Sequence, residues 1–111
     1  MKPKFKVEFL EEALAFLDAQ EPKAREKIIY NIRKAQMTND NDLFKKLTEN
    51  IWEFRTLYKR THYRFFAFWD KTDKTKVVVI STHGLIKKTG KTPKGEIAKA
   101  EKLMELYFKN K

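Results

Sequence analysis

The chain has 111 residues, 41% of them hydrophobic, a size that suits one compact domain over residues 1–111 with one modest core. The absence of cysteine excludes disulfide frameworks and thiolate metal sites, and no apolar stretch approaches the roughly 18 residues of a membrane span, so we expect a cytoplasmic protein without a membrane partner. A net charge of +10 indicates a polyanionic partner, with nucleic acid first, and the alternative is a basic surface that serves only solubility.

The N-terminal part of the chain predicts a strand followed by two helices. Residues 4 to 9 alternate between polar and apolar side chains, which is the period of a strand buried on one face. The apolar positions then change to helical spacing, and Pro22 suits the first turn of a second helix. We therefore expect residues 10 to 37 to form an αα-hairpin that lies on a sheet. The apolar stripes of the two helices are Leu10, Ala13, Leu14 and Leu17, and Ala24, Ile28, Ile32 and Ala35.

Three apolar and aromatic runs follow, at residues 51 to 58, 62 to 69 and 76 to 82, and their short connections predict an antiparallel meander. The last run is apolar on both faces and is expected to be the most buried strand. A basic loop from 83 to 92 then leads to Pro93, where a final helix begins. The order β-α-α-β-β-β-α predicts an α+β fold, in which two N-terminal helices and a C-terminal helix pack on a small, mainly antiparallel, twisted sheet.

Two arginines lie in the predicted strands. The period of two puts Arg55 on the same strand face as Glu53. Arg64 shares its face with His62 and with the apolar Phe66, and a cation on such a face needs an explanation. One explanation is an ion pair with Glu53 or another carboxylate. The other is an anion clamp, since the planar guanidinium matches two phosphate oxygens.

A second group of cations lies just before the predicted final helix. The free N–H groups and the positive dipole end of that helix would add to the lysines in attracting phosphate. The alternative is a solvated basic loop. The group consists of Lys87, Lys88, Lys91 and Lys94.

The two histidines are candidates for acid–base chemistry because imidazole titrates near neutrality. His62 is expected near a hairpin turn in solvent, whereas His83 ends the buried strand beside the basic loop. Two histidines without a third ligand make a metal site improbable, and the single Ser81 has no G-x-S-x-G context for a hydrolase triad.

Three motifs follow one another in the second half of the chain. They are Trp52, Glu53, Phe54 and Arg55; Tyr63, Arg64, Phe65 and Phe66; and His83, Gly84, Leu85, Ile86, Lys87, Lys88 and Thr89, with Lys91, Thr92, Pro93, Glu96 and Ile97. In this order they resemble the HigB branch of the RelE superfamily of bacterial toxins, including its phage-derived host-killing members. The resemblance covers about residues 43 to 105, and the N-terminal β-α-α order agrees with it.

The resemblance implies the toxin of a type II toxin–antitoxin system. Such a toxin enters the A site of the 30S ribosomal subunit and cleaves messenger RNA there, which inhibits translation. A helix-turn-helix antitoxin holds it inactive, and only through that complex does it reach operator DNA. The resemblance also implies chemistry without metal or cofactor, in which a ribose 2′-OH attacks the adjacent phosphate.

By position in these motifs, Arg64 is assigned to the scissile phosphate and Arg55 to support or to an adjacent phosphate. Lys87 or Lys88 matches the basic residue after the last strand, and the general base stays open between these lysines, Glu53 and His83. Glu53 stands where the RelE branch has a lysine, and no tyrosine follows the last strand closely, so the acid–base assignment departs from that branch. The residues expected to contact RNA elsewhere are Lys59, Arg60, Lys91 and Lys94.

Two other functions compete with this interpretation. A ParE-like gyrase inhibitor would have the same fold and act by binding rather than cutting, and the motif from Lys87 to Pro93 argues against it. A nucleic-acid-binding or protein-binding module without chemistry would also agree with the charge and the aromatic content.

Overall fold

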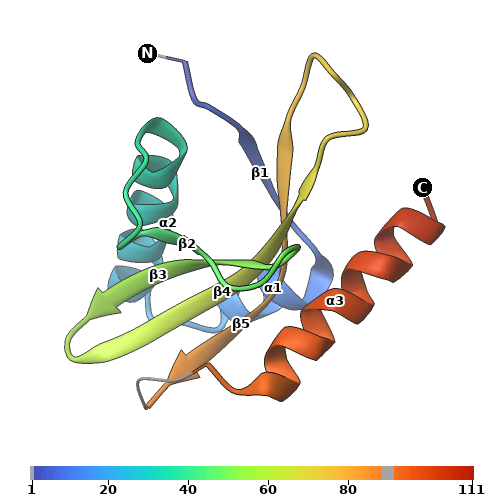
Figure 1. The fold of residues 1–111 in the computed structure, drawn as a ribbon. Helices are drawn as coiled ribbons and strands as arrows, with labels where there is room; N and C mark the ends of the chain where they lie inside the picture. The colour runs from blue at the N-terminus through green and yellow to red at the C-terminus, as the bar shows by residue number, and fades with distance from the viewer. Residues whose placement is uncertain (1, 89–91) are drawn as a thin grey trace.

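A five-stranded sheet with helices on both faces makes up the molecule (Figure 1). The computed structural model describes residues 2–88 and 92–111. Within these residues, no helix has both the length and the apolar composition of a membrane-crossing segment. The elements are β1 (Lys6–Phe9), α1 (Glu11–Asp18), α2 (Pro22–Met37), β2 (Phe44–Lys46), β3 (Trp52–Tyr58), β4 (Thr61–Asp70), β5 (Val78–Lys87) and α3 (Lys94–Lys109).

The helices begin where the sequence places helix-starting signals. Glu11 and Glu12 lie in the first turn of α1, where carboxylates interact favourably with the positive end of the helix dipole. Pro22 is the first residue of α2, a position at which its missing N–H costs no hydrogen bond. Pro93 immediately precedes α3, and Glu96 lies in the first turn of that helix. The two predicted N-terminal helices and the final helix are confirmed.

The strands form one mixed sheet in the order β1-β5-β4-β3-β2. β1 runs parallel to β5, and the other neighbours are antiparallel. The α+β class and the mainly antiparallel sheet agree with the prediction, but the element order does not, because the short strand β2 stands between α2 and β3. β2 has only three residues and pairs only with the first three residues of β3, too short a segment for a period of two to be recognised.

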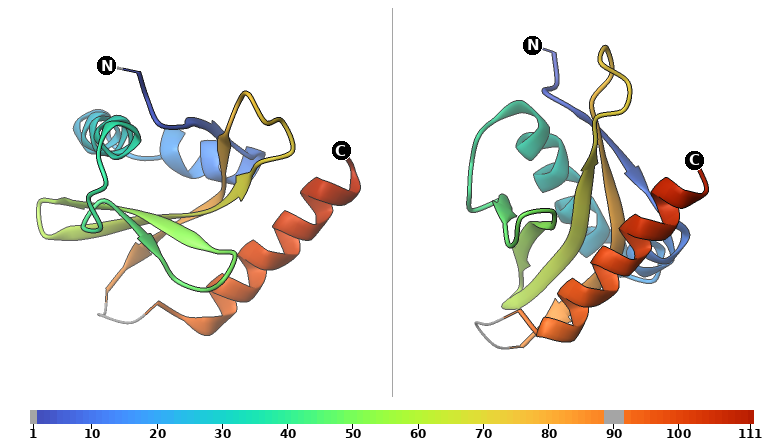
Figure 2. Two further views of the ribbon diagram at one scale, coloured as in Figure 1. Left: turned by 45° about the horizontal axis from the view of Figure 1, so that its top comes forward. Right: turned by 45° about the vertical axis from the view of Figure 1, so that its right-hand side comes forward.

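The helices divide between the two faces of the sheet (Figure 2). α1 and α2 cover one face and α3 crosses the other. The first core, between the sheet and the N-terminal helices, contains Ile28, Phe54 and Phe65, and the second, beneath α3, contains Phe66, Phe68 and Ala100. Side chains that alternate along β4 therefore enter different cores.

The prediction of a basic loop from 83 to 92 is wrong over half its length. β5 continues through Lys87, and its residues His83 and Lys87 pair with Phe66 and His62 of β4. The long partner strand β4 supplies backbone hydrogen bonds along this whole segment, and the glycine within it does not break the ladder. The expectation that the last strand is the most buried is wrong. Val79 and Ile80 of β5 are buried, but β4 has the longer buried run, from Tyr63 to Phe68, because it lies at the centre of the sheet between β5 and β3.

Gly84 of β5 lies against α1, and this close approach requires glycine. A Cβ at position 84 would lie 2.2 Å from the ring of Phe16, whereas a Cβ at Gly95, near the start of α3, would meet no atom within 4 Å. We expect Gly84→Ala to lower the free energy of unfolding by about 2 kcal/mol, since the Phe16 ring must move. Gly95→Ala should raise it by about 0.5 kcal/mol through the lower entropy of the unfolded chain.

Urea denaturation of both variants measures this difference. Equal effects of the two substitutions would contradict the close packing of α1 against β5.

Candidate anion-binding site

A buried carboxylate between two arginines lies on the face of the sheet opposite α1 and α2. Glu53 and Arg55 project from one face of β3, and Arg55 is directly opposite Arg64 of β4. The Glu53 Oε1 atom lies 3.3 Å from Nε of Arg64 and 3.6 Å from Nε of Arg55. Glu53 is 2% exposed and Arg64 5% exposed. The ion pair and the common strand face predicted from the sequence are both present.

Lys87 brings a third cation to the same place from the end of β5. Its side chain is 8% exposed, and its Nζ donates to Oγ1 of Thr92 at 3.1 Å. The Thr92 hydroxyl in turn donates to Oε2 of Glu53 at 3.4 Å. Oε1 of Glu53 thus lies beside the two arginines, and Oε2 accepts the hydrogen bond from Thr92. Glu53, Arg55, Arg64, Lys87 and Thr92 are called the Glu53 cluster below.

Burial lowers the pKa of Lys87. The Glu53 carboxylate acts in the opposite direction, while the like charges of Arg64 and Arg55 lower the pKa further. This ammonium group therefore releases its proton more readily than that of a solvated lysine.

The Glu53 cluster has more cationic than anionic groups, because one carboxylate faces two guanidinium groups and an ammonium group. Burial lowers the pKa of Arg64 as well, with Glu53 opposing the shift, although a guanidinium still carries its charge at neutral pH. Within the described parts of the chain, the Nε atoms of Arg55 and Arg64 have no hydrogen-bond partner. Buried cations in excess of their counter-charges are costly, and a bound anion would offset that cost.

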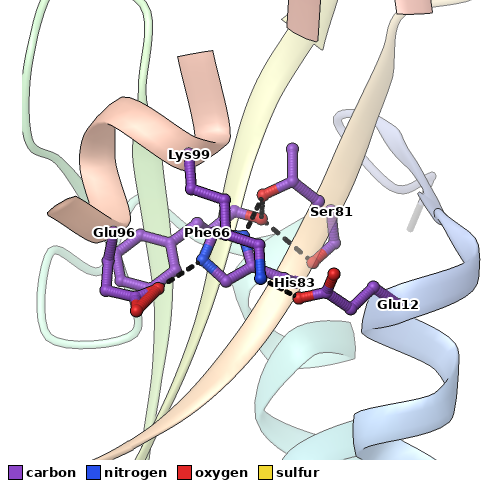
Figure 3. A network of polar contacts seen from close by, with 7 residues as sticks. Glu12, Phe66, Ser81, His83, Glu96 and Lys99 are labelled. Carbon is purple, nitrogen blue, oxygen red and sulfur yellow. Dashed lines mark hydrogen bonds and ion pairs between the residues drawn. The ribbon is translucent and has the colours of Figure 1, made fainter. Parts of the chain in front are cut away.

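His83 does not take part in the contacts of the Glu53 cluster. It is 1% exposed and stacks on Phe66, and its Nε2 lies 2.8 Å from Oε2 of Glu96 in α3 (Figure 3). Its Nδ1 lies 2.9 Å from the hydroxyl of Thr82. Burial lowers the pKa of His83, against the hydrogen bond with Glu96, which raises it. Both ring nitrogens of His83 therefore have hydrogen-bond partners, and the contact at Nε2 joins β5 to α3.

The remaining predicted site residues are exposed and scattered. Lys88 follows the buried Lys87 but is exposed, and His62 is exposed on β4. Lys59 and Arg60 form the turn between β3 and β4, both with positive φ. Lys94 is exposed at the start of α3, and Lys91 lies outside the described residues. Over residues 2–88 and 92–111, no group of three or more His, Asp or Glu side chains could hold a metal ion.

Sequence reasoning missed the role of Thr92. The residue was part of the motif that precedes Pro93, but nothing in the sequence indicated that its hydroxyl would link a lysine to a glutamate 39 positions away. Only the tertiary structure brings Thr92, just before α3, next to Lys87 and Glu53.

Comparison with models of known protein families shows to which family the chain belongs. The model of the family described as phage-derived protein Gp49-like (DUF891) matches residues 15–105, which include the whole Glu53 cluster. The chain belongs to the Gp49-like family. This family is part of the RelE/HigB-type toxin superfamily, and its members are related to the toxins of toxin–antitoxin systems. A search among proteins of curated function found no match to this Gp49-like chain.

The ionic contacts of Glu53 can be tested by comparison with an exposed ion pair nearby. We expect Glu53→Gln to lower the free energy of unfolding by about 3 kcal/mol, because it leaves two guanidinium groups without their buried counter-charge. Glu49, 90% exposed and 3.8 Å from Lys46, provides the control, and Glu49→Gln should have no measurable effect.

Chemical denaturation of the two variants and the unchanged chain gives the comparison. A Glu53→Gln variant as stable as the Glu49→Gln variant would show that the cluster is not paired as described.

Proposed function

We propose that this chain is a HigB-branch toxin of a type II toxin–antitoxin system, an endoribonuclease that cleaves messenger RNA on the translating ribosome. The observation that supports the proposal most strongly is the convergence of Arg55, Arg64 and Lys87 around the buried Glu53. These residues come from three strands, and together they form a cationic surface suited to a bent RNA backbone.

Arg64 binds the scissile phosphate and Arg55 the same or the adjacent one. The charge that develops on the phosphate oxygens in the transition state then meets guanidinium groups that are already held in place. Glu53 is a positioning residue in this scheme, since its carboxylate orients both guanidinium groups through their Nε sides. Nη1 of Arg64 donates to the carbonyl of Tyr63 at 3.3 Å, so the other outer nitrogen of Arg64 and the fork of Arg55 are the groups that bind phosphate.

Lys87 is the proposed general base. In its amine form it accepts the proton of the ribose 2′-OH, whose oxygen forms a bond to phosphorus while the bond from phosphorus to the 5′-oxygen breaks. The 5′-oxygen takes up a proton from water, and the products are a 2′,3′-cyclic phosphate and a 5′-hydroxyl end. The lowered pKa of Lys87 and its position in the Glu53 cluster favour it over the exposed Lys88 and over His83, whose ring nitrogens are both occupied.

The exposed cations complete the proposed RNA contacts. Three exposed cations add to the positive field of the protein surface: Lys59, Arg60 and Lys94. Lys91 is proposed as an RNA contact from the sequence alone. The partners proposed are the A site of the 30S subunit, messenger RNA and a helix-turn-helix antitoxin, which alone connects the toxin with operator DNA. The proposed compartment is the cytoplasm.

Purified protein should cut messenger RNA when translating ribosomes are present and leave naked RNA largely intact. Arg64→Ala should abolish cutting, and Arg64→Lys, which keeps a cation beside Glu53 and so preserves the fold, should lower the rate by about 100-fold because it loses the planar fork. Gel analysis of the transcript measures this.

Comparable cutting of naked RNA, or full activity of Arg64→Lys, would contradict the assignment. DNA breaks that require gyrase would favour the ParE-like alternative instead.

The neighbouring lysines provide a matched pair for the general base. Lys87→Met should lower the cleavage rate by about 100-fold or more, whereas Lys88→Met should lower it less than about threefold. The rate of the unchanged protein should rise with pH by up to about tenfold per unit while Lys87 is mostly ammonium, because the amine fraction grows with pH. It should level off below the ordinary lysine pKa of 10.5.

Single-turnover rates on stalled ribosome complexes between about pH 6 and about pH 8.5 test both points. A Lys88→Met variant as impaired as Lys87→Met, or a rate that falls as the pH rises, would refute the role of Lys87.

A further inference from the structure

A hollow of about 420 Å³ lies beside the Glu53 cluster, between α2 and the outer half of β3. Its volume falls within the range of ligand-binding pockets. Four cationic side chains line it, against one carboxylate, that of Asp42. The cations are Lys27 and Lys34 of α2, Arg55 of β3 and Arg64 of β4.

The two lysines face the hollow from one side of a single helix. Lys27, Asn31 and Lys34 occupy positions i, i+4 and i+7 of α2, a spacing that puts them on one stripe. Asn31 is buried and fixed by a hydrogen bond from its Nδ2 to the hydroxyl of Thr56 at 3.2 Å. The stripe is thus anchored to β3 at its middle, and the lysines flank the anchor.

The hollow is open because β3 has an unpaired outer half. β2 pairs only with residues from Trp52 to Phe54, and the N–H of Arg55 donates to the carbonyl of Leu43 at 2.8 Å, away from β4. By the two-residue period of an antiparallel ladder, the N–H of Leu57 points to the same side. Among the described residues no strand pairs with β3 there, so this backbone donor faces the hollow, which Leu57 lines.

The arginines connect the hollow with the Glu53 cluster. Arg64 is 5% exposed, lines the hollow, and has an Nε without a hydrogen-bond partner in the described chain; the same holds for the Nε of the partly buried Arg55. Both Nε atoms lie beside Glu53, which does not line the hollow, and Nη1 of Arg64 donates to the carbonyl of Tyr63 at 3.3 Å. The two arginines therefore bring their charge to the edge of this hollow, whose lining contains a single carboxylate, that of Asp42.

From these contacts we infer that the hollow is a second phosphate subsite, in which Lys27 and Lys34 bind an RNA backbone phosphate next to the one held by Arg64. This inference rests on the proposed function and extends it to α2. RNA fits better than an acidic peptide, because Arg55 and Arg64 border both spaces and one continuous phosphate chain can occupy them together.

The test measures binding without cleavage. An eight-nucleotide RNA with 2′-O-methyl groups throughout cannot be cut by 2′-OH attack, so its affinity reports on phosphate contacts whether or not the chain is a nuclease. Fluorescence anisotropy over a salt series compares the unchanged protein with Lys27→Gln/Lys34→Gln. The matched control is Lys23→Gln/Arg33→Gln, which removes the same charge from exposed positions of the same helix outside the hollow.

The Lys27→Gln/Lys34→Gln variant should bind about tenfold more weakly at low salt, with a salt slope reduced by about 1, whereas the control should change less than about twofold. A second arm measures binding to vacant 30S subunits. Loss in the oligonucleotide arm supports the subsite, whereas loss only with vacant subunits would place the phosphate on ribosomal RNA and contradict one continuous chain through both spaces.

Equal losses for the two double variants in both arms, or no loss in either, would overturn the subsite, and an acidic segment of a protein partner would then be the better occupant. Because neither arm depends on cutting, failure of the nuclease proposal and failure of the subsite give different results.

Discussion

The arrangement of this protein depends on one buried interaction, the contact of the Glu53 carboxylate with the guanidinium groups of Arg55 and Arg64. Charged groups leave water only at a considerable cost in free energy, and a paired carboxylate is what makes two arginines tolerable in the interior of a small sheet. The pairing is incomplete, since Lys87 adds a further cation and Glu53 is the one carboxylate of the cluster among the described residues. A sheet face that could have been apolar instead carries surplus positive charge, and we propose that it is an anion receptor.

The receptor keeps its shape because α3 is attached to the sheet at both ends. Near its start, Glu96 binds His83 of β5 at 2.8 Å, and Lys99 pairs with Glu12 of α1. Near its end, the hydroxyl of the half-buried Tyr107 donates to Oδ2 of the buried Asp70 at 2.6 Å.

The contact of Tyr107 with Asp70 changes the pKa of the Asp70 carboxyl. Burial alone would raise the pKa of the Asp70 carboxyl, but hydrogen bonds from Tyr107, Thr72 and Lys111 outweigh it and hold that pKa far below its usual range. Below neutrality Asp70 thus stays ionised over a wide pH interval, and α3 remains fixed. The segment before α3, with Thr92, is held over the cluster as a result.

Side-chain alternation made one face of each strand predictable, and it correctly placed Glu53 with Arg55 and Arg64 with Phe66. The register between the strands was not predictable in the same way. It depends on the turn at Lys59 and Arg60, which adopts positive φ without the glycine or asparagine that usually announces such a hairpin. The ion pair and the anion clamp were predicted as alternatives for Arg64, yet the Nε of Arg64 contacts Glu53 and the same residue lines an open hollow.

The lysine pair marks another limit of sequence reasoning. Lys87 and Lys88 are identical in type and adjacent, and only the continuation of β5 decides that Lys87 is buried and Lys88 exposed. No sequence pattern indicated the three-residue strand β2 or the bridging hydroxyl of Thr92, because both depend on contacts with distant parts of the chain. Periodicity reports which face a residue occupies, but not which partner it meets there.

The most direct test of the proposed RNA cleavage is primer extension on cellular transcripts after induced expression, combined with analysis of the chemistry of any new RNA ends. If the Glu53 cluster holds RNA for attack by its own 2′-OH, new ends should appear inside translated reading frames, with a 5′-hydroxyl on one side of the cut and a 2′,3′-cyclic phosphate on the other. Intact transcripts in growth-arrested cells, or cuts that leave 5′-phosphates, would contradict it.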